Sequence, residues 1–241
     1  FVSPKGVDKI NLPQDDEKRD FVKIINPLGE ETSVMRTTLI PNMLDVISTN
    51  LSHKVEEVGA FECGNTFKPQ EGLPVQMKNL CIGMYGKEVD FFVLKGAVEA
   101  IVNNVGLKGY EIEPETTNLT FHPGRCAKLM YNNICLGTFG ELHPDVLENY
   151  SLNQRVYVAE LNLDLVFENL NHVITYNPLP KYPATTRDIA LLVKDEVFVK
   201  QIEDIIKANG EDILESYQLF DVYKGAQIEE GHKSIAYSIT Y

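Results

Sequence analysis

The chain has 241 residues, 44% hydrophobic and 24% charged, a composition typical of a globular protein with one large domain or two ordinary ones. Its 22 basic and 35 acidic residues give a formal net charge of −13, which excludes a protein that coats nucleic acid through its whole surface. Any contact with RNA must therefore be local. The sequence has no apolar run long enough to cross a bilayer and no signal peptide, so we expect a cytoplasmic protein without membrane or DNA partners.

The cysteines favour neither a zinc site nor a redox motif. Cys63, Cys81, Cys126 and Cys135 lie far apart and form no CxxC pair. We expect all four to be buried, reduced thiols of a cytosolic protein.

Both ends of the sequence suggest a piece of a longer protein. The chain begins with Phe1 and a polar stretch over residues 5–20. It stops on a strict alternation that places Ile235, Tyr237, Ile239 and Tyr241 on one face of a strand. A strand with such an apolar face needs partners, so we expect material to be missing at both ends.

Two helices are predicted in the first half of the chain. In residues 40–51, apolar side chains recur at helical spacing, and Pro41 stands at the first position, where a helix tolerates proline. In residues 90–106, Asp90 is a good N-cap and Gly106 a good stop signal.

Strands are predicted between and after these helices. Residues 58–67 are apolar but interrupted by Gly64 and Asn65, which we interpret as a hairpin turn. Residues 80–85 and 156–161 are further strands. Residues 127–131 and 134–139 flank Asn132 and Asn133, a pair suited to a tight hairpin because Asn tolerates positive φ. The first domain is therefore predicted to be α+β, with a mostly antiparallel sheet.

A second domain is predicted after the proline-rich stretch YNPLP (176–180), which gives domain boundaries of 1–175 and 176–241. A strand over residues 189–193 precedes a helix over 199–208, with Gly210 just past its end, and strands over 213–223 and 234–241 follow. This β-α-β-β order is the first two thirds of a ferredoxin-like βαββαβ unit, so the domain is predicted to be truncated.

Catalytic motifs are missing. The sequence has no GxGxxG, no GxxxxGK[ST] and no HExxH, so we predict no catalytic residue, no metal site and no cofactor in this chain. The GTFG run at residues 137–140 is interpreted as a strand bend rather than a phosphate-binding loop. His122 and His143 each precede a proline and are expected to be structural.

Six segments in order resemble the β subunit of bacterial phenylalanyl-tRNA synthetase. They are NPLGEETSVMRTTLIPNMLDVISTN (26–50), EVGAFECGNTF (57–67), FHPGRCAKL (121–129), GTFGELHPDV (137–146), YPATTRDIALLV (182–193) and FDVYKGAQIEEGHKSIAYSITY (220–241). The resemblance implies a class II synthetase-like catalytic module that has lost its active site, followed by a ferredoxin-like anticodon-binding domain. Class II sites hold ATP with a motif 2 arginine, and residues 60–64 (AFECG) contain none.

The resemblance also implies partners. The holoenzyme is an α2β2 assembly that uses ATP and magnesium, whereas the editing and magnesium-binding domains of the family lie upstream of this region. Residues 35–50 resemble motif 1, which builds subunit interfaces in this fold. Candidate residues for contact with the catalytic α subunit are Arg36, Ile40, Leu44, Ile47 and Leu51. The alternative for the four apolar residues is simple core packing, and the alternative for Arg36 is a solvated or capping arginine near the helix start.

The resemblance places RNA contacts in the second domain. Proteins recognise single-stranded RNA by stacking its bases on aromatic side chains or on the guanidinium plane of arginine. The candidates are therefore Tyr182, Arg187, Phe220, Tyr223 and Lys233. Alternatively, Arg187 forms a local ion pair with Asp188, and at least one of Phe220 and Tyr223 packs in the core.

Three functions remain open. The first is a non-catalytic part of phenylalanine–tRNA ligase that scaffolds the α subunit and contacts tRNA. The second is a pure assembly module without RNA binding. The third is an autonomous adenylating enzyme, which phenylalanine-dependent ATP–pyrophosphate exchange would reveal and which the missing arginines disfavour.

Overall fold

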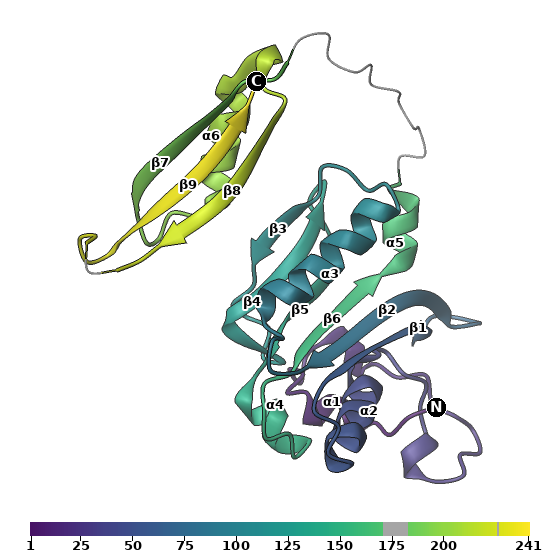
Figure 1. Ribbon diagram of the computed structural model, residues 1–241. Helices are drawn as coiled ribbons and strands as arrows, with labels where there is room; N and C mark the ends of the chain where they lie inside the picture. The colour runs from purple at the N-terminus through teal and green to yellow at the C-terminus, as the bar shows by residue number, and fades with distance from the viewer. Residues whose placement is uncertain (171–182, 226) are drawn as a thin grey trace. The chain divides into compact units, whose positions relative to one another are not determined.

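The computed structural model describes residues 1–170, 183–225 and 227–241. The chain divides into two compact units, Phe1–Val173 and Ile174–Tyr241 (Figure 1). The predicted boundary at 175/176 lies outside the described residues, so its exact position stays a prediction. Within the described part of the chain, no helix is long and apolar enough to cross a membrane.

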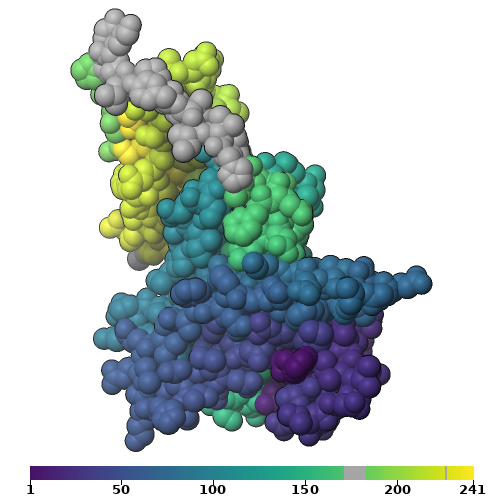
Figure 2. All heavy atoms as spheres, turned by 90° about the vertical axis from the view of Figure 1, so that its right-hand side faces the viewer, coloured from purple at the N-terminus to yellow at the C-terminus, as the bar shows by residue number. Residues whose placement is uncertain are grey.

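The first unit is built on a six-stranded antiparallel sheet with the order β1-β2-β6-β5-β4-β3. Its strands are β1 Val58–Lys68, β2 Val75–Tyr85, β3 Glu111–Pro114, β4 Phe121–Tyr131, β5 Ile134–Leu142 and β6 Tyr157–Asn162. The β1–β2 hairpin extends beyond the rest of this unit (Figure 2).

Helices cover both faces of this sheet. On one face, α2 (Ile40–Ser52) packs on β1 and β2, accompanied by the short α1 (Gly6–Lys9) and α4 (Pro144–Asn149). On the other face, α3 (Phe91–Asn104) packs on β5 and β6, while α5 (Leu163–Glu168) lies against β2 (Figure 1). Each face has its own apolar core, with Leu44 and Val158 in one and Leu94 and Phe139 in the other.

Several predicted elements of the first unit are confirmed. Asp90 caps α3 by accepting from Val93 N, and Pro41 stands within the first turn of α2. Asn132 and Asn133 have φ of 47° and 64° and join β4 to β5 in the expected tight hairpin.

The predicted hairpin turn at Gly64 and Asn65 is wrong, because β1 runs unbroken through both residues. Gly64 serves a close approach instead: a Cβ there would collide with the guanidinium of Arg36. The turn that joins β1 to β2 lies at residues 69–74. The expectation of four buried cysteines is also wrong for two of them. All four are free thiols, but Cys63 and Cys135 are exposed.

The second unit is a three-stranded antiparallel sheet with the order β7-β9-β8. Its elements are β7 Thr186–Lys194, α6 Val199–Gly210, the 3-10 helix η3 Glu211–Ile213, β8 Ser216–Tyr223 and β9 His232–Thr240 (Figure 1). The predicted β-α-β-β order is confirmed, with two local corrections. Gly210 ends the helix rather than following it, and Ile213 belongs to η3 rather than to β8.

One face of the second sheet packs on α6. Ile202 from the helix meets Ile235, Tyr237 and Ile239 from the central strand β9, and side chains of β7 and β8 complete this core. The mixed α and β content and the antiparallel sheets confirm the predicted α+β fold class.

Candidate functional site

A cleft of about 570 Å³ opens on the α2 side of the first sheet, at the N-terminal start of that helix. Its floor comes from β1, β2, β5 and β6, and its wall from the N-terminal segment at residues 10–20 and the loop at residues 115–120. The volume lies within the range of small-molecule sites.

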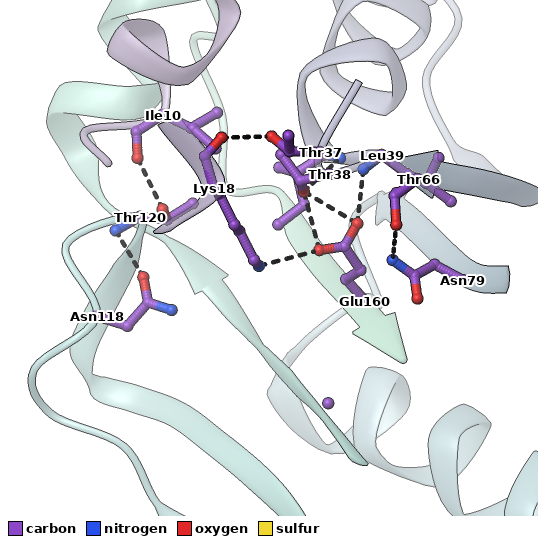
Figure 3. Close-up of polar contacts among 12 residues, drawn as sticks. Ile10, Lys18, Thr37, Thr38, Leu39, Thr66, Asn79, Asn118, Thr120 and Glu160 are labelled. Atoms are coloured by element: carbon purple, nitrogen blue, oxygen red, sulfur yellow. Dashed lines mark hydrogen bonds and ion pairs between the residues drawn. The ribbon is translucent and has the colours of Figure 1, made fainter. Parts of the chain in front are cut away.

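Glu160 of β6 is the most connected side chain on the cleft floor (Figure 3). Its carboxylate accepts hydrogen bonds from Leu39 N at 2.6 Å and from Thr38 Oγ1 at 2.9 Å. Lys18 Nζ lies 3.5 Å from Oε2 and completes the set. These contacts satisfy orphan donors at the start of α2 and attach the N-terminal segment to the sheet.

The N-terminal segment is held in place by backbone acceptors as well. Thr37 Oγ1 donates to Lys18 O at 2.6 Å, and Thr120 Oγ1 donates to Ile10 O at 2.7 Å (Figure 3). Arg19 donates to Leu12 O and forms an ion pair of 2.6 Å with Asp8. The wall of the cleft is therefore an ordered part of the first unit.

Asn79 of β2 lies on the floor and forms a second polar pair with Thr66 of β1, which is fully buried (Figure 3). Asn79 Nδ2 donates to Thr66 Oγ1 at 3.1 Å, and the two residues are 8% and 0% exposed. Asn79 Oδ1 is buried and has no hydrogen-bond partner among the described residues. An unpaired buried acceptor of this kind costs about 1–3 kcal/mol.

Glu115 lines the far end of the cleft and pairs with Lys128 of β4. Burial alone would raise the pKa of Glu115. The hydrogen bonds from Lys128 and from Thr117 outweigh that effect and lower this pKa to about 2. The same contact raises the pKa of Lys128, so both groups are charged at neutral pH.

The cleft is acidic overall. Five carboxylate residues and three lysines line it: Asp16, Glu17, Asp20, Glu115 and Glu160, with Lys18, Lys68 and Lys128. Each lysine already faces a carboxylate of the chain. Lys68 pairs with Glu17 at 2.6 Å, Lys18 with Glu160 and Lys128 with Glu115. The arrangement favours binding of cations over anions, and none of the three lysines is left unpaired to bind a phosphate group.

The predicted interface residues of α2 lie in the core of their own unit. Ile40, Leu44 and Ile47 are 5%, 0% and 0% exposed, and Leu51 is half-buried against the same cluster. Their side chains therefore pack in this core, and their part in a subunit interface stays a prediction. Arg36 is also occupied within the chain: it pairs with Glu62 at 2.7 Å and donates to Asn65 O.

The two His-Pro turns are structural in this geometry. His143 Nδ1 accepts from Asp145 N and His122 Nδ1 accepts from Gly124 N, so each imidazole closes its own turn. Arg125, which follows the first turn, pairs with the buried Glu141 at 2.7 Å rather than facing solvent alone.

Phe220 and Tyr223 lie on the second sheet, away from α6. Both are exposed, at 56% and 42%, so neither packs in the core. Tyr223 pairs in register with Ser234 of β9. The next residue of β9, Ile235, belongs to the core beneath α6, so Ser234 and Tyr223 lie on the opposite face. Phe220 is the extra residue of a bulge between Leu219 and Asp221. The two aromatic rings therefore share the open face of this sheet.

The other predicted RNA-contacting residues do not join them. Lys233 pairs in register with the core residue Val193, which places it on the α6 side, and its Nζ donates to Asp195 O at 2.9 Å. Arg187 stands two residues before Ile189 on β7 and therefore shares its α6 side. Arg187 donates to Thr186 O, and Asp188 accepts from Ser238 Oγ. Tyr182 lies outside the described residues.

Sequence reasoning missed Glu160 and Asn79. A signal for Glu160 was present, because it is the one charged residue in the predicted strand at residues 156–161. Among the residues that the structure describes, no group of three or more His, Cys, Asp or Glu side chains could hold a metal ion.

Comparisons with known proteins agree over nearly the whole chain. Residues 1–163 match the family described as phenylalanyl tRNA synthetase beta chain CLM domain, and residues 180–241 match the ferredoxin-fold anticodon binding domain. The phenylalanine–tRNA ligase beta subunits of Clostridium acetobutylicum and Clostridium tetani are similar at 48% and 49% identity over the whole chain. That of Symbiobacterium thermophilum is similar at 36%.

The chain spans about a third of the length of these relatives, 31% for both Clostridium proteins. The match of the first family covers more than half of the chain, and the second family follows it in the order that the two structural units show. The chain therefore belongs to the phenylalanyl-tRNA synthetase beta chain family.

Proposed function

We propose that this chain is a non-catalytic part of a phenylalanine–tRNA ligase, which scaffolds a catalytic α subunit and contacts tRNA through its second unit. The relatives carry the name of the ligase's beta subunit, and the second unit matches an anticodon-binding fold. The observation that supports the proposed tRNA contact is the open face of the second sheet, which carries Phe220 and Tyr223. An α2β2 assembly and a cytoplasmic location are part of this proposal.

The cleft of the first unit supports a non-catalytic role. A bound ATP needs cations that face its phosphates, and the three lysines of the cleft already face Glu17, Glu115 and Glu160. The surplus of carboxylates would repel a triphosphate. The residues present do not fit ATP with magnesium, so we assign no reaction step to this chain and leave the chemistry to the α subunit.

The RNA contact is tested with the double variant Phe220→Ala/Tyr223→Ala, made in the complete β chain and assembled with its α subunit. Base–aromatic stacking is worth about 1–3 kcal/mol per base, so the affinity for tRNA should fall about ten-fold or more. The measurement is a tRNA titration at fixed salt, because phosphate contacts vary steeply with salt.

Phe198→Ala is the matched control for that variant. Phe198 is 58% exposed but stands at the start of α6, so its loss should leave tRNA affinity unchanged. If both variants bind tRNA like the wild type, the chain is an assembly module without RNA binding.

We propose that the subunit contact uses side chains other than the stripe of α2, because Ile40, Leu44 and Ile47 are at most 5% exposed. The loop between Val22 and Met35 presents Ile25 and Leu28 at 94% and 102% exposure. Hydrogen bonds from Ile24 N to Ser33 O and from Met35 N to Val22 O close its base. Residues 24–29 carry no charge, and depletion of charge is typical of interface cores.

Ile25→Ser/Leu28→Ser is therefore expected to weaken the association with the α subunit about ten-fold or more, because each apolar side chain contributes about 1.5–3 kcal/mol on burial. Sedimentation of the mixed subunits measures the association. Leu73→Ser, at an 85% exposed position of the β1–β2 turn, is the control. Equal association of all three proteins would remove this loop from the interface but leave the scaffold proposal standing.

A further inference from the structure

The cleft of the first unit contains buried polar side chains in a row across neighbouring strands. Asn79 of β2 and Glu160 of β6 line it, Thr66 of β1 is the buried hydrogen-bond partner of Asn79, and Thr138 of β5 stands opposite Glu160. The first three are 8% exposed or less. Burying polar groups costs free energy unless each finds a partner, and an apolar floor would serve the sheet equally well.

Asn79 is the member of this row whose hydrogen bonding is incomplete. Its Nδ2 is used by Thr66, but the buried Oδ1 accepts from no group in the described part of the chain. Asn79 pairs with Asn162 in register, and Glu160 stands two residues before Asn162. The two residues are therefore diagonal neighbours, with backbone positions about 7–8 Å apart, a separation that long side chains can bridge. A ligand with several N–H donors could serve both.

Glu160 is held by one weak cationic contact. Leu39 N and Thr38 Oγ1 are firm donors, whereas Lys18 Nζ lies 3.5 Å away on a side chain that is 43% exposed. Lys18 belongs to the short 3-10 helix Glu17–Arg19 in the wall of the cleft. The Lys18 ammonium therefore occupies the position beside Glu160 that the cationic group of a ligand would take.

The rest of the cleft agrees with a cationic ligand that has an apolar body. Carboxylates outnumber lysines along its lining, five to three. Phe67, Met77 and Leu165 supply apolar surface beside the polar row. We propose that this cleft binds a small primary amine with an apolar body, whose ammonium displaces Lys18 and donates to Glu160 and to Asn79 Oδ1.

The test is a titration of the chain with phenethylamine, followed in amide nitrogen–proton NMR spectra. Saturable shifts are expected at Lys18, Thr38 and Asn79, with a dissociation constant of about 1 mM, as suits so small a ligand. The uncharged 2-phenylethanol, which has the same shape, should give no saturable shift at these residues.

Variants separate binding from structure. Lys18→Met removes the competing ammonium and should tighten amine binding about ten-fold. Lys78→Met is its control: Lys78 precedes Asn79 on β2 and points to the opposite face, so the same loss of charge should leave binding nearly unchanged. Asn79→Leu should weaken binding about ten-fold while the melting temperature holds or rises, because it removes an unpaired buried acceptor.

A purely structural Asn79 would behave differently, with a lower melting temperature and unchanged amine affinity. The proposal is overturned if neither the wild type nor Lys18→Met shows saturable shifts in the cleft. It is equally overturned if Lys78→Met tightens binding as much as Lys18→Met, since only the net charge would then matter.

Discussion

Buried carboxylates organise the first unit at the level of single residues. Glu115, Glu141 and Glu160 are 4%, 4% and 8% exposed, and each has a cationic neighbour. Removing one partner of such a pair leaves an uncompensated charge, which costs more than the pair itself contributes. These side chains hold loops and the start of α2 against the sheet.

Glu115→Gln is expected to lower the free energy of unfolding at pH 7 by about 2 kcal/mol, because Lys128 and Thr117 lose the carboxylate. The pKa of Glu115 falls from 4.5 to about 2 on folding. Its contribution is thus complete above pH 4.5 and is lost as the pH falls toward 2. Urea unfolding across this window should show the two proteins converging in stability. Glu113→Gln, at an exposed position of β3, should not show this convergence.

The sequence predicted residue roles only where the chemistry is local. Asp90 and the two asparagines of the β4–β5 turn act on their nearest neighbours, so spacing was enough to find them. Glu160 meets Thr38 across 122 positions of sequence, and no local pattern encodes such a pair. The ion pair of Arg36 was hidden for the same reason, because its partner Glu62 lies on another element.

At the scale of elements, glycine and asparagine decide where strands turn and where they approach each other. A Cβ at Gly137 would collide with Glu160 O, and one at Gly140 would lie 2.5 Å from Arg125 O. Close packing of β4, β5 and β6 thus requires the two glycines of the GTFG run. This agrees with its interpretation as part of a strand rather than a phosphate-binding loop. Gly64 looked like a turn signal, yet it too marks a close approach, which only the position of Arg36 could reveal.

Asn133→Val should lower the free energy of unfolding by about 1–2 kcal/mol, because a β-branched residue is strained at the positive φ of 64° that this turn requires. Asn133→Gly should be close to neutral, since glycine adopts this conformation freely. Thermal unfolding of the two variants measures the difference, and an equal effect of Val and Gly would contradict the assigned turn geometry.

At the scale of the whole molecule, the chain carries separate cores in its two units. Ile235→Ala removes a fully buried side chain from the second core and should cost that unit about 2–5 kcal/mol. Amide hydrogen exchange should then quicken in β7, β8 and β9, while β2 and β6 keep their protection. Leu192→Ala, at a 61% exposed position of β7, should leave both sets unchanged.

The fold class, the order of elements and the existence of two domains were predictable because hydrophobic periodicity and turn residues act within short windows. The cleft was not, because its lining combines segments from residue 10 to residue 165. The choice between core and interface for the α2 stripe also depended on tertiary packing, since Ile40, Leu44 and Ile47 would show the same spacing in either case.

The strand order has a consequence for the route by which the first unit folds. Its hairpins β1–β2 and β4–β5 join neighbours in sequence and can form within microseconds. The sheet closes only when β6 enters between β2 and β5, which brings Lys78 to Asp164 across 86 positions. Closure of so long a loop is entropically costly and slows folding. During that delay the inner edges of β2 and β5 are unpaired, so this stage is when the chain is most exposed to aggregation.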